Sequence, residues 1–298
     1  MKKVLFGISL MILAFGGMTV NAQNIIDAED ENNLSNFYQR RISSTKRALP
    51  YPNLRESDVI WETCVWRTID FREKFNQFFY FPKGEDTNNN NQNRINLAFL
   101  VYKSARNGEF EVFEDDELKI PMDWEQVYKK TNKERTQLVG YEEDEYGEVI
   151  NEGHDSVYNE AFNSDNYYQI YLKEYWYIDK QDTRMKVRII GLALVDENCR
   201  EVEGETSCSP TARFWIPMDN MNVRNVLARN DAYDMYNNRM ERSYDEIFIS
   251  RYFESYITRE TNVYNRKIHD YLTGEDAQLE SQNIEDRIFD IESDMWEY

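Results

Sequence analysis

Residues 167–195 read YYQIYLKEYWYIDKQDTRMKVRIIGLALV, and this stretch decides the fold. From Tyr167 to Ile178 it is dense in aromatic and β-branched residues, which favour strands. Asp179 to Thr183 is turn-like, and Met185 to Val195 alternates before it becomes fully apolar. The stretch therefore predicts a long antiparallel hairpin, and Phe214 to Pro217 predicts a further strand after it.

Helical patterns flank the hairpin on both sides. Apolar residues recur at helical spacing after Ser57, although an alternating pattern from Val59 to Val65 fits a strand as well. A second helix is predicted from Arg94 to Arg106. Beyond Met218 two more helical faces are expected: Ile247, Phe248, Tyr252, Tyr256 and Ile257, then Ile284, Ile288 and Ile291. The sequence thus predicts an α+β protein: an antiparallel sheet packed with helices.

The predicted organisation has four parts. Residues 1–22 form a signal peptide, 23–50 an extended basic arm, 51–217 the α+β core, and 218–298 a helical C-terminal region with an acidic tail.

In the first part, Lys2 and Lys3 precede an apolar run, and Ala22 and Gln23 flank the expected cleavage site. An uncleaved anchor is the alternative, because the apolar run approaches the lower limit for a membrane span. Position 23 is Gln rather than the Cys that a lipoprotein needs. We therefore expect an exported, unlipidated chain that a partner protein holds at a membrane.

Charge is distributed unevenly along the chain. The sequence has 55 acids and 35 bases, a net charge of -20, which disfavours nucleic acid or anionic lipid as a partner. Between Asn32 and Arg55 there are bases and no acid, whereas from Asp270 onward Arg287 is the only base among many acids. Three interpretations fit: solvated mobile ends, an arm that meets the acidic tail of a neighbouring copy, or ends that bind different partners.

The cysteines allow one disulfide. Cys199 and Cys208 flank Gly204 at a spacing that suits a bridge across the neck of a strand-loop-strand unit. Cys64 is then left over, either as a buried free thiol or in an intermolecular disulfide.

No catalytic or cofactor-binding motif is present. The sequence lacks a Gly-x-Ser-x-Gly elbow, a Gly-rich phosphate loop and a His-Glu-x-x-His pair, so no enzyme, cofactor or metal site is predicted. Residues 142–155 are acidic and contain no base, which predicts an exposed loop; they fail the EF-hand pattern, and loose calcium binding stays open. His154 and His269 are interpreted as surface residues.

Aromatic residues make up 14% of the sequence, which a large core explains in part. Tyr, Trp and Arg also dominate binding hot spots, so an interaction protein is favoured. The candidate interface residues are Arg40, Arg41, Lys46, Arg47, Trp61, Trp66, Arg67, Arg251, Tyr252, Arg259, Trp296 and Tyr298.

Two distant segments resemble the GldN/PorN family. The first runs through RESDVIW at 55–61 and VWRTIDFREK at 65–74 to Tyr80-Phe81-Pro82. The second comprises RYFESYI at 251–257, NVYNR at 262–266, YLTGED at 271–276 and Trp296-Glu297-Tyr298, with Trp215-Ile216-Pro217 between them. The Asn run at 88–93 and the acidic stretch at 142–155 depart from the family pattern.

The resemblance implies a non-catalytic periplasmic subunit of a type IX secretion system tied to gliding motility. Such a subunit would bind a GldK/PorK-type outer-membrane lipoprotein, a GldM/PorM-type inner-membrane motor protein and neighbouring copies of itself in a ring. The competing hypothesis is a secreted binding module or hydrolase that acts on cell-envelope glycan.

If the arm meets the tail of a neighbour, replacing Arg40, Arg41, Lys46 and Arg47 with Glu will weaken subunit association. The effect will be larger at low salt, because exposed charges are screened beyond about 10 Å at 0.1 M ionic strength. Sedimentation velocity over a salt series measures it. An oligomer size that does not change with salt contradicts the arm-to-tail contact.

Overall fold

The structure is a computed structural model that describes residues 46–83, 94–143, 149–160, 162–181, 184–202, 205–234, 237 and 242–295. In the strand segments 133–143, 149–160, 198–202 and 205–208 only the backbone is described. The predictions for the signal peptide, Arg40, Arg41, the Asn run, Trp296 and Tyr298 lie outside the described residues.

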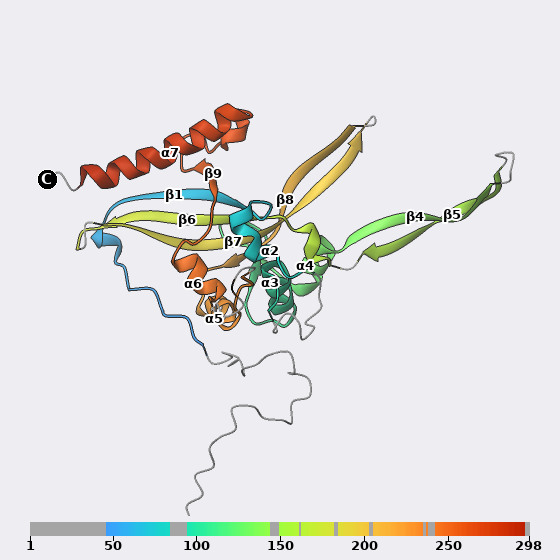
Figure 1. The fold of residues 1–298 in the computed structure, drawn as a ribbon, viewed down its shortest axis with the longest axis horizontal. Helices are drawn as coiled ribbons and strands as arrows, with labels where there is room; N and C mark the ends of the chain where they lie inside the picture. Colours follow the sequence, from blue (N-terminus) through green and yellow to red (C-terminus); the bar gives the residue numbers. More distant parts are fainter. Residues whose placement is uncertain are drawn as a thin grey trace, which may run out of the picture. The chain divides into compact units, whose positions relative to one another are not determined.

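An antiparallel seven-stranded sheet forms the centre of the fold, in the order β3-β2-β8-β7-β6-β1-β9 (Figure 1). Its strands are β1 Val59–Asp70, β2 Val112–Phe113, β3 Pro121–Met122, β6 Gln169–Asp179, β7 Met185–Val202, β8 Glu205–Pro217 and β9 Tyr256–Glu260. The predicted hairpin is confirmed as β6 and β7, which pair from Gln169 opposite Val195 to Ile178 opposite Met185. The α+β fold class is therefore confirmed.

The helix predicted after Ser57 is wrong, because β1 occupies these residues. β1 lies between β6 and β9. Cys64 and Val65, which are consecutive and so face opposite sides of the sheet, are both buried. A strand covered on both faces loses the strict alternation that marks a half-exposed strand, and its apolar residues can then imitate a helical period.

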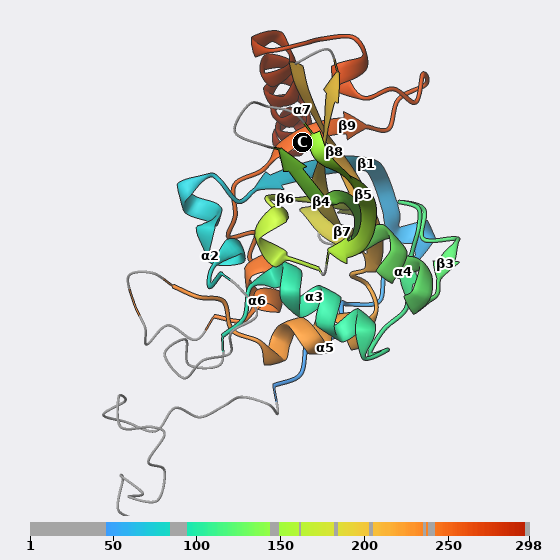
Figure 2. The same cartoon turned by 90° about the vertical axis from the view of Figure 1, so that its right-hand side faces the viewer.

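Helices α2 Gln77–Tyr80, α3 Leu97–Arg106, α4 Trp124–Thr131, α5 Met221–Arg229 and α6 Tyr244–Ile249 surround the main core. This core joins Leu97 and Val101 of α3 and Tyr244 of α6 to Leu172 and Leu192 of the sheet. α3 begins where the Asn96 side chain accepts a hydrogen bond from the Phe99 N–H at 2.7 Å. Figure 2 shows α3, α5 and α6 grouped together, apart from α7.

α7, Glu275–Asp294, covers the edge strand β9. The predicted helical face is wrong at Tyr252, which lies after the end of α6, and at Tyr256 and Ile257, which belong to β9 and pair with Thr68 and Arg67 of β1. The Ile257 N–H donates to Ser281 Oγ of α7 at 2.8 Å. An unpaired N–H at a sheet edge attracts foreign strands, so α7 closes this edge of the sheet.

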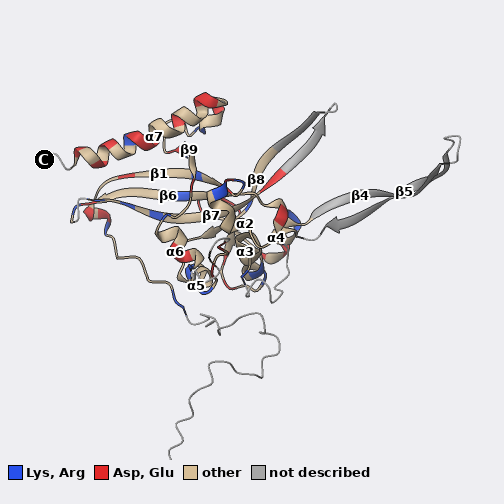
Figure 3. Cartoon of the chain, in the orientation of Figure 1, with Lys and Arg blue, Asp and Glu red and all other residues tan. Residues whose placement is uncertain are grey.

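α7 also forms a second, smaller core. Ala277, Ile284 and Ile288 of α7 are buried against Val65 and Ile257. Acidic residues run along the rest of the helix (Figure 3). None of the helices in the described ranges has both the length and the apolarity that a membrane crossing requires.

The exposed loop predicted for residues 142–155 is wrong over most of its length. β4 Lys133–Glu143 and β5 Val149–Glu160 form a separate two-stranded antiparallel sheet, in which Val139 is opposite His154. Strand propensity reflects packing and burial more than the backbone itself, so a charged sequence can pair where no core is required of it.

Two further predictions concern segments at the border of the described residues. The register of β7 and β8 sets Cys199 directly opposite Cys208, so the candidate disulfide stays a prediction that the backbone pairing suits.

Of the predicted arm, Lys46 forms an ion pair with Asp231 at 3.2 Å, and the Ala48 N–H donates to Asn225 Oδ1 at 3.0 Å. The last residues of the arm are therefore bound to the body of their own chain.

Ser281→Ala is expected to lower the free energy of unfolding by about 1–3 kcal/mol, because the buried N–H of Ile257 loses its acceptor. Ser293→Ala on the same helix is the matched control, since Ser293 is exposed and its replacement should change the stability by less than about 0.5 kcal/mol. Urea denaturation at equilibrium measures both. Equal midpoints for the two variants would contradict the proposed closure of the edge.

Candidate interaction surface

Asn76 joins two segments that are far apart in the sequence. It lies in the turn Lys74–Asn76 between β1 and α2 and is fully buried. Its Nδ2 donates to the Glu254 carbonyl at 2.9 Å, and its Oδ1 accepts from the Glu254 N–H at 3.0 Å. The side-chain amide thus pairs with both backbone groups of Glu254 as a neighbouring strand would. Segment 251–257 is thereby fixed against the end of β1.

A buried carboxylate holds the same two segments together. Glu174 of β6 has no exposed surface, and its Oε1 accepts from Arg251 Nη1 at 2.7 Å. Its Oε2 accepts from Trp176 Nε1 at 3.0 Å and lies 3.8 Å from Arg67 Nε. Arg67 also donates to Ser255 Oγ at 3.1 Å and forms an ion pair with Glu285 of α7. One carboxylate therefore connects β6, β1 and segment 251–257, and through Arg67 also α7.

The network is charged although Glu174 and Arg67 at its centre are buried. Burial lowers the pKa of the Arg67 guanidinium, while Glu174 and Glu285 raise it. Arg67 is only 4% exposed, and guanidinium stays protonated under such conditions. Because the Glu174 carboxylate and the Arg67 guanidinium are both desolvated, each depends on the charge of the other to remain buried.

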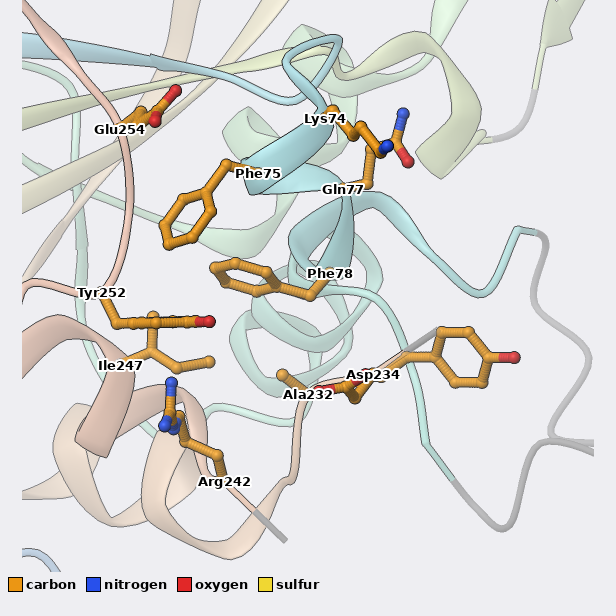
Figure 4. Close-up of a pocket in the computed structure, with 11 residues that line it drawn as sticks. Lys74, Phe75, Gln77, Phe78, Ala232, Asp234, Arg242, Ile247, Tyr252 and Glu254 are labelled. Carbon is orange, nitrogen blue, oxygen red and sulfur yellow. The ribbon is translucent and has the colours of Figure 1, made fainter. Parts of the chain in front are cut away.

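An aromatic cavity of about 550 Å³ lies beside the Asn76 contact (Figure 4). Phe75 and Phe78 lie on one side of the Tyr252 ring, with centroids 4.7 and 6.0 Å from it. Phe75 is 39% and Tyr252 42% exposed, so both rings are open to a ligand. The remaining lining residues are Lys74, Gln77, Ala232, Tyr233, Asp234, Arg242, Ile247 and Glu254. The volume is in the range of cavities that bind small molecules or peptide side chains.

Arg242 forms the opposite wall of this cavity. Its guanidinium carbon lies 4.0 Å from the Tyr252 ring centroid, so the ring is held between Phe78 and a cation (Figure 4). Its Nη1 is buried and makes no hydrogen bond with the described residues. A buried donor without an acceptor is costly in a folded protein.

A second aromatic and cationic cluster lies on the face of β1 opposite to Arg67. The Trp66 indole N–H donates to Asp116 Oδ2 at 2.9 Å, and Arg259 stacks on the ring at 3.9 Å from its centroid. Lys173 lies 5.2 Å from the same ring.

Nearby, burial raises the pKa of the Cys64 thiol to about 11, which keeps it protonated and unreactive near neutral pH.

The candidate interface residues in the described part of the chain differ in what they contact. Tyr252 lines the aromatic cavity and is exposed, whereas Arg67 and Arg251 are engaged with Glu174 inside the fold. Trp61 packs against the α7 core, and Trp66 and Arg259 stack on each other. Their role at an interface stays a prediction.

Sequence reasoning did not single out Phe75, Phe78 or Arg242 for this role. Phe78 was visible as part of an aromatic run before Pro82. Arg242 carried no signal, because part of the cavity lining, Phe75 and Phe78 included, comes from a segment more than 160 positions earlier.

The fold and the site together define an α+β protein with an exposed aromatic cavity. The chain belongs to the family of the gliding motility associated protein GldN, whose sequence model matches residues 54–297. The match includes every residue of the Glu174 network and of the cavity. The family is associated with gliding motility and is not a family of known enzymes. No curated protein matches the chain.

Glu174→Ala is expected to lower the free energy of unfolding by about 3–5 kcal/mol, because the buried Arg67 loses its only buried counter-charge and the partly buried Arg251 loses its ion-pair partner. Glu285→Ala is the matched control: its side chain is 51% exposed, and its loss should cost at most about 1 kcal/mol. Denaturant midpoints at an unchanged slope give both values. A Glu174→Ala variant as stable as the control would show that the network does not hold the segments together.

Proposed function

We propose that the chain is a non-catalytic subunit of the periplasmic type IX secretion ring. In this role it binds a GldK/PorK-type outer-membrane lipoprotein, contacts neighbouring copies of itself, and links the ring to a GldM/PorM-type motor protein for secretion and gliding motility. The observation that carries the proposal is the family match over residues 54–297, which extends across nearly all described elements.

Three features support a role in binding polypeptides. The aromatic cavity combines exposed rings with the arginine Arg242, the composition typical of hot spots at protein interfaces. The scaffold beneath it is rigid, since Asn76 and Glu174 fix both lining segments. α7 closes the β9 edge, so contacts are left to side-chain surfaces there.

The predicted signal peptide agrees with an exported protein, and Gln23 in place of a lipid-bearing Cys agrees with a subunit that depends on a lipoprotein partner. The basic arm and acidic α7 give the chain two surfaces of opposite charge that suit a heterologous contact between copies.

Co-expression with the GldK/PorK-type lipoprotein from the same organism tests the proposal. Negative-stain electron microscopy is expected to show rings only when both proteins are present. Deletion of residues 23–45 is expected to abolish ring formation while the body stays folded, because it spares Lys46 and Ala48, which contact the body.

A Glu275→Gln variant, which changes one exposed acid and leaves the fold untouched, is the control and should still form rings. Single monodisperse particles in both samples would overturn the proposal and favour a secreted module that binds or hydrolyses glycan.

A further inference from the structure

We infer that the solvent-facing side of α7 binds the basic arm of a second copy of this chain. The part of the arm concerned is residues 37–42, which read FYQRRI. The inference rests on the proposed assembly function and deepens it, because it names the two surfaces at which copies meet.

The outer face of α7 consists of Leu279, Asp286, Phe289 and Asp290. Leu279, Asp286 and Asp290 recur at helical spacing on the side opposite to the residues of α7 that are buried in the second core, and Phe289 borders them. Leu279 is 51% and Phe289 67% exposed. Two large apolar side chains therefore lie open to solvent beside two carboxylates on one face of the helix.

The carboxylates of this face have no basic partner in the described part of the chain. Asp286 and Asp290 are exposed and one helical turn apart, so their charges repel each other. Arg287 is the only base of α7 and is paired with Glu260 at 2.6 Å. Asp294 ends the helix, where the dipole favours cations, yet the last turn contains no base. A cation from outside the helix would relieve both unfavourable effects.

The arm supplies the complementary groups. Segment 37–42 combines two aromatic residues, two arginines and an isoleucine, and no acid lies within five positions on either side of it. Lys46, the next base along the chain, is already paired with Asp231 of its own chain, whereas Arg40 and Arg41 precede this contact. Guanidinium groups pair strongly with carboxylates, and arginine and aromatic side chains dominate binding hot spots.

The spacing of these groups agrees between the two segments. Leu279 and Phe289 are ten residues apart on a helix, which corresponds to about 15 Å. Phe37 and Ile42 are five residues apart, which corresponds to about 17 Å in an extended chain. Asp286 lies between the two apolar residues of the helix, as the two arginines lie between the apolar ends of the arm segment. Apolar and charged contacts can therefore form together.

The place where the arm leaves the body explains why a second copy is the partner. Lys46 and Ala48 are held by Asp231 and by Asn225 of α5. Figures 1 and 2 both show the described start of the arm, the thin blue segment, beside α5 and on the opposite side of the body from α7. A head-to-tail contact brings the arm of one copy to α7 of the next, and such a contact closes into a ring or continues as a filament.

A peptide titration tests the contact directly. The receiving protein is the full chain with Arg40→Ala and Arg41→Ala, so that its own arm does not compete. A fluorescently labelled peptide of residues 32–45 is titrated into it, and the anisotropy is measured. Saturable binding is expected. In the receiving chain, the α7 double variant, Asp286→Lys with Asp290→Lys, should weaken binding at least tenfold, and Phe289→Ala should weaken it severalfold.

A matched control and a charge exchange make the result specific. Glu56→Lys with Glu111→Lys makes the same change in net charge at two exposed acids outside α7 and should leave binding unchanged. A peptide with Arg40→Glu and Arg41→Glu should bind the native α7 at least tenfold more weakly and should recover its affinity on the α7 double variant. Far-UV circular dichroism verifies that every variant is folded.

Co-expression with the lipoprotein tests whether the contact joins different copies. A chain with Arg40→Glu and Arg41→Glu and a chain with the α7 double variant should each fail to form rings. Together they should form rings, because each arm then meets the α7 of opposite charge in the next copy. A mixture that fails while the unaltered chain forms rings would overturn the contact between copies.

The absence of saturable peptide binding to the folded chain would overturn the inference. Binding that survives the α7 double variant, or that falls equally in the Glu56→Lys and Glu111→Lys control, would overturn α7 as the site. The peptide titration needs no lipoprotein, whereas failure of the proposed function appears as the absence of rings with the unaltered chain. The two failures are therefore distinguishable.

Discussion

The buried carboxylate of Glu174 is the interaction on which the rest of the structure depends. It holds Arg67 and Arg251 at the place where β6, β1 and segment 251–257 meet. Without Glu174, the guanidinium group of Arg67 would be desolvated with only the half-exposed Glu285 as a partner, and a fold of marginal stability tolerates such a loss poorly. The two cores, one under α3 and α6 and one under α7, adjoin this charged centre. Its geometry therefore fixes how α7 and the aromatic cavity are set on one sheet.

The cavity depends on this arrangement and on Asn76. Tyr252 follows Arg251 directly, so the salt bridge to Glu174 determines where its ring lies. Phe75 and Phe78 belong to the turn and helix that begin beside Asn76. A rigid frame holds the rings in place at no further cost in conformational entropy, and preorganisation of this kind favours tight binding. The family match places the whole arrangement in a protein associated with gliding motility.

Several elements could be predicted because their signals are local. The β6–β7 hairpin showed dense strand residues around a turn, and the helix predicted from Arg94 to Arg106 contains α3. β1 and β9 could not be assigned, since their partners are distant and both are covered, which removes the alternation of a half-exposed strand. Of the cavity, Tyr252 was predicted at an interface, while Phe75, Phe78 and Arg242 were not.

The sequence by itself determined the family, the fold class and the charge asymmetry between the arm and α7, because these follow from composition, local period and two ordered motifs. Only the tertiary structure decided that Asn76 meets Glu254, 178 positions away, and that Phe75 packs against Tyr252. Hydrogen bonds and burial depend on which surfaces a sheet brings together. That pairing is set by long-range packing, so no window of neighbouring residues contains it.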